Sequence, residues 1–483
     1  MTRVHFIGIC GTAMATLAAM LKRKGLAVRG SDQDVYPPMS TFLEREGIPI
    51  LVGYEAGHIT NDLDLVIVGN AISRGNAELE EVLDRKIRYC SLPEAVREHF
   101  LWGSRSIVVA GTHGKTTTTA LVGWLLVHGG LDPSILVGGV AANLGAEGAS
   151  YRLGAGRDFV IEGDEYDSAF FDKTAKFLKY LPDIAVVANV EFDHADIYPD
   201  LDAVRLAFRR LANLVPRKGL LLLGADSPDA LALTAMARSR VETFGLADSA
   251  DWFAYDLEAS PSGARFRVRH LRLSLGMFEM PMAGAHNVKN ALAAMAVATD
   301  VGLDIDTIRE GLLAFAGVKR RLETVGSASG VTVLDDFAHH PTAVRETLAA
   351  VRASHPDARI WAVFEPRSAS SCRRVFQQAF AESFVAADEV IIAGVYRSTL
   401  PAEQRLSPER LIADLSAAGV HARFIPDVST IVETLAREAR HGDIVVVMSN
   451  GGFGGIHAKL LDALAAPEPL GRGSVGEGVS PIS

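Results

Sequence analysis

The chain has 483 residues, of which 48% are hydrophobic and 22% are charged. This is an ordinary globular composition, and the length is enough for about three domains. The formal net charge of -10 argues against nucleic acid as the main partner, although single loops can still bind an anionic substrate.

The beginning of the sequence shows neither the basic stretch nor the apolar stretch of a signal peptide. No apolar run approaches the roughly 18 residues that a membrane span needs. The three cysteines, Cys10, Cys90 and Cys372, are scattered without metal-ligand spacing. We therefore expect a cytoplasmic protein with no membrane partner, whose reduced thiols pack as small side chains.

Residues 1–103 begin with a strand, a turn, a helix and a second strand. The predicted elements are a buried strand at Val4–Ile7, a turn at Gly8–Met14 and a helix through Lys24. A second strand, at Ala27–Arg29, is predicted to end in a turn formed by Gly30, Ser31 and Asp32. An acidic residue at this distance is where a Rossmann unit contacts a ribose. The glycine fingerprint is imperfect, because Cys10 and Ala13 stand at its second and third glycine positions. The pattern fits a NAD site, a UDP-sugar pyrophosphate or a purely structural turn.

A second candidate loop follows the buried strand Leu65–Val68. The segment Asn70–Asn76 is polar, and it lies at the carboxyl end of a predicted parallel strand, where open α/β sheets bind ligands. Ordinary turn chemistry explains Asn70, Ser73 and Arg74 equally well.

The most informative stretch is Ser106–Thr119. A buried strand at Ile107–Ala110 leads into the turn Gly111-Thr112-His113-Gly114, and a helix is predicted from Lys115 to His128. Such a turn presents backbone N–H groups to a phosphate, and the helix dipole adds to the attraction. Lys115 can reach the β- and γ-phosphates of a nucleotide, and the Thr116 hydroxyl can ligate Mg²⁺. The loop is shorter than the usual P-loop, which would need glycine at Val109.

Two further strands of this region end in polar clusters. Phe159–Glu162 is followed by Gly163–Asp167, and Ile184–Val187 is followed by Asn189–His194. Mg²⁺ prefers a few oxygen ligands plus substrate phosphates, so Thr116 and Glu162 are suitable donors. His194 is a less typical Mg²⁺ ligand, and chemistry alone favours a hydrogen-bonding or catalytic histidine.

Three more segments stand out before residue 323. The basic and aromatic segment Phe171–Phe177 is predicted as an exposed loop. Gly284–Asn290 precedes an alanine-rich helix that runs to Asp300, where polar side chains often only cap the helix. Gly317–Glu323 is predicted as a hinge with a basic pair.

From residue 323 to 465, strands and helices alternate, which predicts another doubly wound α/β unit. The strands are predicted at Val331–Leu334, Ile360–Phe364, Glu389–Ile392 and Ile444–Met448, and the helices at Pro341–Arg352, Arg374–Phe384, Pro408–Ala418 and Val428–Arg440. Polar loops follow three strands, and the last of them, Ser449–His457, is either a second phosphate loop or a tight turn that needs positive φ. Residues 466–483 are rich in Gly, Ser, Pro and charge, so we predict a disordered tail.

The loop Gly111–Thr116 resembles the ATP loop of the Mur ligase family, the cytosolic enzymes that extend peptidoglycan precursors. With the other motifs, the resemblance covers the chain from Arg3 to about Leu464. It implies an α/β fold class with the three-domain Mur ligase architecture, and ATP and Mg²⁺ as cofactors. The implied domains are a Rossmann-like UDP-sugar-binding domain at 1–103, a central P-loop ATP-binding domain at 104–322 and a Rossmann-like peptide-binding domain at 323–465.

The resemblance also assigns roles to residues. ATP would be bound by Gly111, Thr112, His113, Gly114, Lys115, Thr116, Thr117, His286, Asn290, Arg321 and Asp336. The UDP-sugar would be bound by Gly11, Thr12, Ala13, Met14, Ser31, Asp32, Asn70 and Ser73. The metal ligands would be Thr116, Glu162 and His194, and the peptide would contact His339, Arg367, Arg373 and Asn450. The residues with an implied catalytic role are Lys115, Glu162, His194 and Arg321.

One position departs from part of the family. The ligases that add later amino acids carry a carbamylated lysine downstream of the metal histidine, and Arg209 stands near its place here. Arginine cannot take that role, which argues against a second metal bridged by such a lysine and matches the alanine-adding and tripeptide-adding branches.

The implied activity is ATP-dependent amide ligation onto UDP-N-acetylmuramic acid through an acyl phosphate. Three local features resemble the peptide-recycling branch of the family. They are the Gly8–Met14 turn, the Phe171–Lys176 insertion, and the Ser449–His457 loop with Glu365–Ser368. That branch joins the murein tripeptide L-Ala-γ-D-Glu-meso-diaminopimelate to the sugar. The alternatives are the alanine-adding ligase of the same family, a nicotinamide-dependent oxidoreductase and a non-catalytic P-loop regulator. The oligomeric state is not predicted.

Overall fold

The computed structural model describes residues 1–396 and 400–466, and these form two compact units. The first unit contains residues 1–321 and 345–356, and the second contains 322–344 and the described residues from 357 onward. No helix in the described part of the chain is long and apolar enough to cross a membrane. The tail predicted at 466–483 lies outside the described residues, apart from Ala466.

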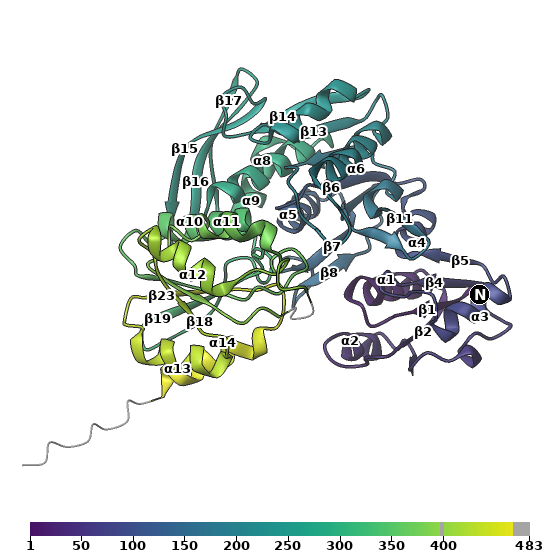
Figure 1. Ribbon diagram of the computed structural model, residues 1–483. Coiled ribbons are helices and arrows are strands. Elements are labelled where there is room, and N and C mark those ends of the chain that lie inside the picture. The colour runs from purple at the N-terminus through teal and green to yellow at the C-terminus, as the bar shows by residue number, and fades with distance from the viewer. Residues whose placement is uncertain (397–399, 467–483) are drawn as a thin grey trace, which may run out of the picture. The chain divides into compact units, whose positions relative to one another are not determined.

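The N-terminal part of the first unit is a five-stranded parallel sheet in the order β3-β2-β1-β4-β5, drawn in purple and dark blue in Figure 1. The elements are β1 (Arg3–Ile7), α1 (Thr12–Arg23), β2 (Ala27–Asp32), α2 (Met39–Arg45), β3 (Ile50–Val52), β4 (Leu65–Val68), α3 (Ala77–Asp84), β5 (Tyr89–Ser91) and α4 (Leu92–Val96). Strand β4 has the predicted bounds. Gly30, Ser31 and Asp32 are not a turn as predicted, because they extend β2 and pair with β3.

A ten-stranded sheet forms the rest of the first unit, in the order β17-β16-β15-β14-β13-β12-β6-β9-β7-β8. Its strands are β6 (Arg105–Ala110), β7 (Ser134–Ala141), β8 (Ala149–Arg152), β9 (Asp158–Glu162), β12 (Ile184–Val187), β13 (Leu220–Gly224), β14 (Arg240–Gly245), β15 (Trp252–Ser260), β16 (Gly263–His270) and β17 (Leu273–Met280). Its main helices are α5 (Lys115–His128), α6 (Leu201–Leu214), α7 (Pro228–Leu231), α8 (Ala285–Asp300) and α9 (Ile305–Leu313). Helices α5 and α8 pack against each other, and α5 has the predicted bounds.

The central strands of this sheet are parallel, so their carboxyl ends meet at one edge. Strand β6 pairs with β12 on one side and β9 on the other. The residues that follow these three strands, after Ala110, Glu162 and Val187, are therefore brought together. The hydrophobic runs Ile107–Ala110 and Ile184–Val187 are buried, which is why the sequence pattern predicts them well.

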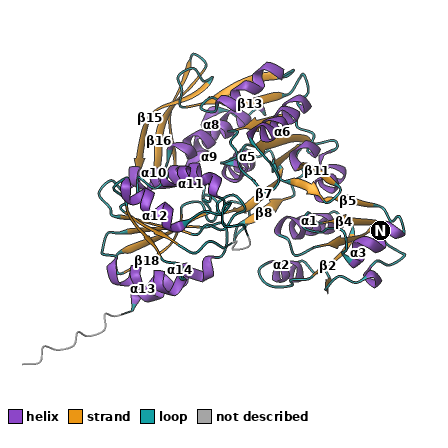
Figure 2. Cartoon of the chain, viewed as in Figure 1, coloured by secondary structure: helices purple, strands orange, loops and turns teal. Residues whose placement is uncertain are grey.

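Two antiparallel features differ from the sequence prediction or were not predicted. The segment Phe171–Phe177 is not an exposed loop: residues 172–175 form β11 (Asp172–Ala175), which pairs with β10 (Asp167–Ala169). Burial of Ala175 and Phe177 and an ion pair from Lys173 to Asp167 of 2.6 Å hold this hairpin in place. The hairpins of β15, β16 and β17 extend the ten-stranded sheet (Figure 2).

The second unit contains a six-stranded sheet in the order β18-β19-β23-β20-β21-β22. The elements are β18 (Glu323–Ala328), β19 (Val331–Asp336), α10 (Pro341–Ser354), β20 (Ile360–Phe364), α11 (Gln377–Ala381), β21 (Glu389–Ile392), α12 (Pro408–Ala417), β22 (His421–Phe424), α13 (Val428–Glu438), β23 (Ile444–Met448) and α14 (Ile456–Ala465). Helix α10 crosses the boundary between the units. Strands β20, β21 and β23 have the predicted bounds, whereas β22 and the antiparallel edge strand β18 were not predicted.

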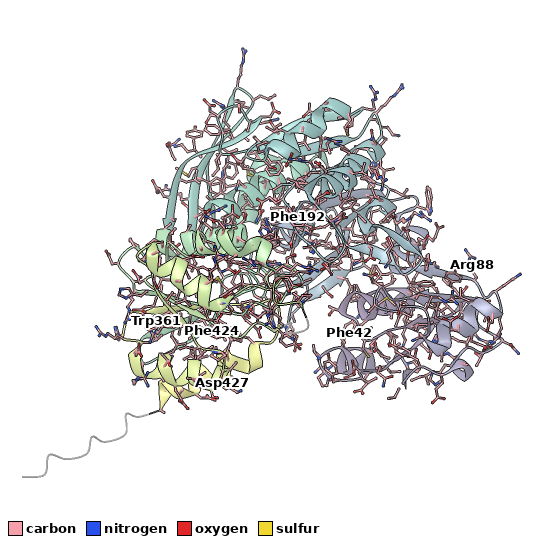
Figure 3. The ribbon with its side chains drawn as sticks, in the orientation of Figure 1. Phe42, Arg88, Phe192, Trp361, Phe424 and Asp427 are labelled. Carbon is pink, nitrogen blue, oxygen red and sulfur yellow. The ribbon has the colours of Figure 1, made fainter. Side chains whose placement is uncertain are left out.

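The helix predicted at Arg374–Phe384 is wrong in its bounds. The backbone N–H of Arg374 donates to the carbonyl of Gln404, so the chain first makes a short 3-10 turn, and α11 ends at Ala381. Trp361 on β20, labelled in Figure 3, is fully buried in the core of the second unit. The guanidinium carbon of Arg359 lies 4.5 Å from the ring centre of Trp361, a cation–π contact.

Candidate active site

The turn between β6 and α5 has a conformation that requires glycine. Gly111 has φ 134° and Gly114 has φ 81°, both in the region that side chains rarely adopt. A Cβ atom at Gly114 would lie 2.6 Å from the side-chain oxygen of Asn290. Because Gly114 is the N-cap and has no side chain, the first N–H groups of α5 are left for an anion. The turn therefore has a backbone conformation that suits an anion.

Lys115 is the first residue of α5, and its side chain folds back over this turn. Its ammonium donates to the carbonyl oxygens of Gly111, at 2.8 Å, and Thr112, at 3.1 Å, and forms an ion pair of 2.8 Å with Glu165. Burial opposes protonation of this lysine, but the carboxylates of Glu165 and Asp164 outweigh it and raise the pKa of Lys115. Lys115 is therefore a cation throughout the neutral pH range.

Glu162 ends strand β9 beside the start of α5. Its carboxylate accepts hydrogen bonds from the Thr116 hydroxyl, at 3.1 Å, and from the backbone N–H of Gly138, at 2.7 Å. Burial raises the pKa of Glu162 above its usual value, although Lys115 acts in the opposite direction. The Thr116 hydroxyl also accepts a 3.3 Å hydrogen bond from Arg321. Glu162 and Arg321, two of the predicted catalytic residues, thus both contact the predicted metal ligand Thr116.

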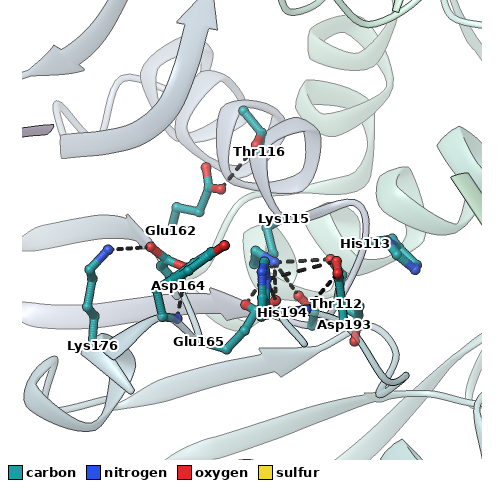
Figure 4. Close-up of polar contacts among 12 residues, drawn as sticks. Thr112, His113, Lys115, Thr116, Glu162, Asp164, Glu165, Lys176, Asp193 and His194 are labelled. Carbon is teal, nitrogen blue, oxygen red and sulfur yellow. Dashed lines mark hydrogen bonds and ion pairs between the residues drawn. The ribbon is translucent and has the colours of Figure 1, made fainter. Parts of the chain in front are cut away.

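His194 follows β12 and lies beside Lys115 (Figure 4). It has φ 52°, and its ring packs on Tyr166 with 4.2 Å between ring centres. Its Nε2 donates to Glu165 at 2.8 Å. Burial lowers the pKa of His194, but the hydrogen bond and charge of Glu165 outweigh it, and the pKa is raised. An unusual backbone conformation among charged groups with shifted pKa values is typical of a functional site.

Glu165 is the residue of this site that sequence reasoning did not assign. It joins Lys115 to His194, which lie on different strand ends. The signal in the sequence is the acidic run Gly163–Asp167, but nothing in that run distinguishes Glu165 from Asp164. The two carboxylates differ through their partners, since Asp164 pairs with Lys176 at 2.6 Å.

Two of the three predicted metal ligands lie together at this sheet edge. The Thr116 hydroxyl and Glu162 carboxylate are oxygen donors of the kind that Mg²⁺ prefers, and their oxygens are 3.1 Å apart. The third, His194, is hydrogen-bonded to Glu165 instead, at 2.8 Å. Arg209, near the place of a carbamylated lysine in other branches, is exposed on α6.

Two predicted ATP-binding residues, His286 and Asn290, lie on helix α8, and Asn290 is close to the turn. Asn290 is buried, accepts a 3.1 Å hydrogen bond from Thr118, and donates one of 3.2 Å to Asn287. Its oxygen lies where a Cβ at Gly114 would collide, so it also supports the phosphate turn. His286 is partly exposed at the start of the same helix.

The predicted UDP-sugar residues divide into two groups. Gly11, Thr12, Ala13 and Ser73 are exposed at the carboxyl edge of the N-terminal sheet. The Ser31 hydroxyl is fully buried and donates to Glu78 at 2.5 Å, and Met14 lies in the core, so these two offer a ligand only their main chain.

Asp32 and Asn70 are engaged by the protein itself. Asp32 accepts the backbone N–H of Cys10 at 2.8 Å, which fixes the turn after β1. Asn70 donates to Asp167 of β10 at 3.1 Å, so the loop after β4 is tied to the β10–β11 hairpin.

The predicted peptide residues lie in the second unit. The Arg367 guanidinium packs over the ring of Tyr396 at 3.6 Å and lies 3.5 Å from Glu365. Glu365 accepts a 2.5 Å hydrogen bond from Ser449 at the start of the glycine loop. Among the described residues, the side-chain oxygen of Asn450 and Nε of Arg373 are buried without a hydrogen-bond partner. These atoms are suitable contacts for a polar ligand.

Asp336 and His339 also belong to the second unit. Asp336 accepts backbone N–H groups of Leu322 and Ala338, both at 2.8 Å, and the ring of His339 donates to the carbonyl of Phe337 at 2.9 Å. Asp336 thus holds the loop after β19 to the end of the predicted hinge segment.

Comparison with known proteins gives the family. The chain matches three models: "Mur ligase family, catalytic domain" at residues 3–101, "Mur ligase middle domain" at 109–298, and "Mur ligase, glutamate ligase domain" at 320–451. It is 41% identical over 469 residues to the UDP-N-acetylmuramate–L-alanyl-γ-D-glutamyl-meso-2,6-diaminoheptandioate ligase of Escherichia coli, covering 96% of this chain and 98% of the relative. The chain belongs to the Mur ligase family. It is therefore an ATP-dependent ligase that forms C–N bonds, and this finding sets aside the oxidoreductase and the non-catalytic regulator.

Two further comparisons concern the two branches of the family. The crystal structure of a murein peptide ligase from Psychrobacter arcticus matches with a TM-score of 0.72 and 36% identity, covering 97% of this chain and 100% of that one. The UDP-N-acetylmuramate–L-alanine ligase of Desulfitobacterium hafniense is 35% identical over 450 residues, covering 93% of this chain and 97% of the relative. The predicted three-domain α/β architecture is confirmed, and the similarity to peptide ligases exceeds that to this alanine ligase.

Proposed function

We propose that this ligase joins L-Ala-γ-D-Glu-meso-diaminopimelate to UDP-N-acetylmuramic acid, in the recycling of peptidoglycan peptides. The observation that carries the proposal is the 41% identity, over nearly the whole of both chains, to a ligase with this peptide in its name. The 35% identity to an alanine-adding ligase supports the second candidate, in which free L-alanine is the amine.

The proposed reaction has two steps. The lactyl carboxylate of the UDP-sugar attacks the γ-phosphorus of ATP, which forms an acyl phosphate and releases ADP. The peptide amine then attacks the acyl carbon, the amide bond forms, and phosphate leaves. Catalysis of this kind depends on positioning the reactants and on stabilising the charge of the transferring phosphoryl group.

The residues at the turn after β6 supply that stabilisation. The N–H groups at the start of α5 and the Lys115 ammonium bind the phosphates, and Arg321, beside Thr116, adds a second positive charge. Thr116, Glu162 and His194 would hold Mg²⁺, which when bound neutralises charge on the transferring phosphoryl group. In the proposed assignment, residues 1–103 bind the UDP-sugar, 104–322 bind ATP, and 323–465 bind the peptide.

The proposed peptide contacts are His339, Arg367, Arg373 and Asn450. A tripeptide carries carboxylates that free L-alanine lacks, and a guanidinium fork suits a carboxylate. Stacking on Tyr396 holds the plane of the Arg367 fork in one orientation. Arg367→Ala should therefore raise the apparent KM for the peptide more than that for ATP.

An ADP-release assay with UDP-N-acetylmuramic acid and ATP tests the proposal. The tripeptide and L-alanine are compared as the amine at equal concentration, and omission of the UDP-sugar gives the background rate. We expect release that depends on the UDP-sugar and is faster with the tripeptide. Faster release with L-alanine would replace the proposal by the alanine-adding function.

A further inference from the structure

Asn189 is the second residue after strand β12 and has no role in the proposed function. Its backbone carbonyl accepts a hydrogen bond from the N–H of Thr112 at 3.1 Å. Its side-chain oxygen accepts one from the N–H of His113 at 2.8 Å, and its side-chain amide donates one to the carbonyl of His113 at 3.2 Å. One residue thus satisfies three main-chain groups of the turn after β6, although it follows His113 by 76 positions.

The loop that contains Asn189 holds the same turn at a second place. The N–H of Glu191 donates to the Thr112 hydroxyl at 2.8 Å, and this hydroxyl donates to the Glu191 carbonyl at 3.3 Å. A Cβ atom at Gly111 would lie 3.1 Å from the backbone nitrogen of Ala188, so the loop and the turn are in close contact. Successive residues of the turn are therefore bonded to, or packed on, successive residues of the loop.

The loop is itself fixed by the sheet and the core. The N–H of Ala188 donates to the carbonyl of Ala110 at 3.1 Å, which continues the pairing of β12 with β6. Val190 is buried, and its N–H donates to the hydroxyl of Ser227, the N-cap of α7, at 3.3 Å. Asn189 thus lies between two anchored neighbours and can act as a rigid support for the turn.

The hydrogen bonds of Asn189 decide which groups of the turn face a ligand. Because the N–H groups of Thr112 and His113 are directed at Asn189, an anion is left to the N–H groups at the start of α5 and to Lys115. The two residues that Asn189 holds lie between Gly111 and Gly114, which have positive φ, and glycine has the widest conformational freedom of any residue. Without a fixed partner, this segment would have to be ordered at the moment of binding, which costs affinity.

We propose that Asn189 is a positioning residue for the nucleotide. It holds Thr112 and His113 so that the N–H groups at the start of α5 and the Lys115 ammonium face the phosphates. A carboxamide suits this task because it offers a donor and an acceptor side by side to one main-chain unit. The inference rests on the proposed function only in that the turn after β6 binds the nucleotide phosphates, and it is independent of the amine that is joined.

Nucleotide binding by Asn189→Ala tests the proposal apart from turnover. The Kd values of a non-hydrolysable ATP analogue and of AMP are measured by titration calorimetry at one fixed Mg²⁺ concentration. We expect the Kd of the analogue to rise about tenfold or more, because the turn loses two hydrogen bonds that hold it. AMP lacks the β- and γ-phosphates that the turn binds, so its Kd should change less than about threefold. In steady-state assays, the apparent KM for ATP should rise, whereas that for the UDP-sugar should not.

A milder variant guards against loss of the fold. In Asn189→Ser, a hydroxyl replaces part of the hydrogen bonding of the carboxamide, and the loss of affinity should be smaller but of the same kind. The matched control is Asn76→Ala, which also removes an asparagine that is bonded to main-chain groups. Asn76 caps α3 and accepts the N–H groups of Glu78, at 3.1 Å, and Leu79, at 3.0 Å. It should leave the Kd of the analogue unchanged, and thermal melting checks that every variant is folded.

Two results would contradict this inference alone. One is a folded Asn189→Ala whose Kd for the analogue equals that of the wild type, and the other is an equal loss of affinity for the analogue and for AMP. Lys115→Ala separates these results from a failure of the proposed function. If Lys115→Ala leaves the Kd of the analogue unchanged, the turn after β6 is not the phosphate site, and the proposed role of this turn fails together with the inference.

Discussion

Two glutamates of the first unit, Glu78 and Glu162, have pKa values that are shifted in opposite directions. Glu78, behind the N-terminal sheet, is fully buried and accepts hydrogen bonds from Ser31 at 2.5 Å, His58 at 2.6 Å and His5 at 3.0 Å. Burial works to raise its pKa, but these bonds outweigh burial and hold the pKa of Glu78 below its usual value. Glu162, beside the phosphate turn, has a raised pKa because burial dominates.

The direction of the pKa shift distinguishes a carboxylate with a structural role, Glu78, from one that a bound cation would stabilise, Glu162. Glu78 is satisfied by the protein, and through Ser31 it supports the turn after β1, since the Ser31 carbonyl accepts the N–H groups of Gly8 and Ile9. Glu162 is more costly to ionise in the protein than in water, so a bound cation would stabilise its charge. A carboxylate at a strand end whose pKa is raised therefore marks the site better than burial does.

The largest expected effect is on Lys115. Lys115→Ala removes the cation at the phosphate turn and should lower ATP turnover at least about a hundredfold. Lys176→Ala is the matched control, because Lys176 is also paired to a carboxylate of the same segment, and it should lose far less. ADP formation by folded protein is the measurement, and near-normal turnover in Lys115→Ala would remove the turn from the nucleotide site.

Glu162→Gln should raise the Mg²⁺ concentration needed for half-maximal activity by about tenfold or more, because a neutral amide is a poorer ligand for a hard cation. The same change should raise the melting temperature of the Mg²⁺-free protein at pH 7. A folded-state pKa above the unfolded value makes ionisation cost stability, and this cost vanishes below the unfolded pKa of about 4.3. An unchanged Mg²⁺ titration would take Glu162 out of the metal site.

Glu78→Gln should act in the opposite direction and destabilise the protein by about 2 kcal/mol at pH 7, because it weakens three buried hydrogen bonds. The pKa of Glu78 is lowered in the folded state, so its contribution is complete above about pH 4.3 and is lost as the pH falls through the folded value. Urea unfolding of both proteins at pH 7 and about pH 3 checks this. A constant difference between them at the two pH values would contradict the pKa direction.

The smallest expected effect is at the turn after β1, in contrast to the turn after β6. Gly114→Ala places a Cβ at φ 81° and 2.6 Å from Asn290, and should cost about 1–3 kcal/mol. Gly11, the N-cap of α1, has φ -63° and its nearest Cβ contact would be 3.7 Å, so Gly11→Ala should change stability by less than about 1 kcal/mol. Chemical denaturation compares the pair. Equal losses would mean that both turns depend on glycine.

The sequence predicts well those parts of the fold that one stretch of residues determines. Buried runs such as Ile184–Val187 and Ile444–Met448 are β12 and β23 with unchanged bounds. The antiparallel strand β16 was missed although buried Phe266 and Val268 alternate with exposed arginines, which is the pattern of a half-buried strand. The hairpin of β10 and β11 was missed because its strands have only three and four residues, most of them polar.

Side-chain partners far apart in sequence could not be predicted. The Thr116–Glu162 pair follows from the order of strands and from the family pattern, so both residues were predicted. Glu165 was not, because its partners Lys115 and His194 are 50 and 29 residues away. Glu78 and His5 are 73 residues apart and come together only through the order of strands in the N-terminal sheet.

The central claim is that this chain transfers a phosphoryl group from ATP to a carboxylate before it forms the amide. UDP-N-acetylmuramic acid with both lactyl carboxylate oxygens replaced by ¹⁸O tests this directly, with ATP and the tripeptide as co-substrates and mass spectrometry of the products. An acyl phosphate predicts one ¹⁸O in each phosphate released and one in the amide product. Phosphate without ¹⁸O, formed together with the amide, would contradict the claim.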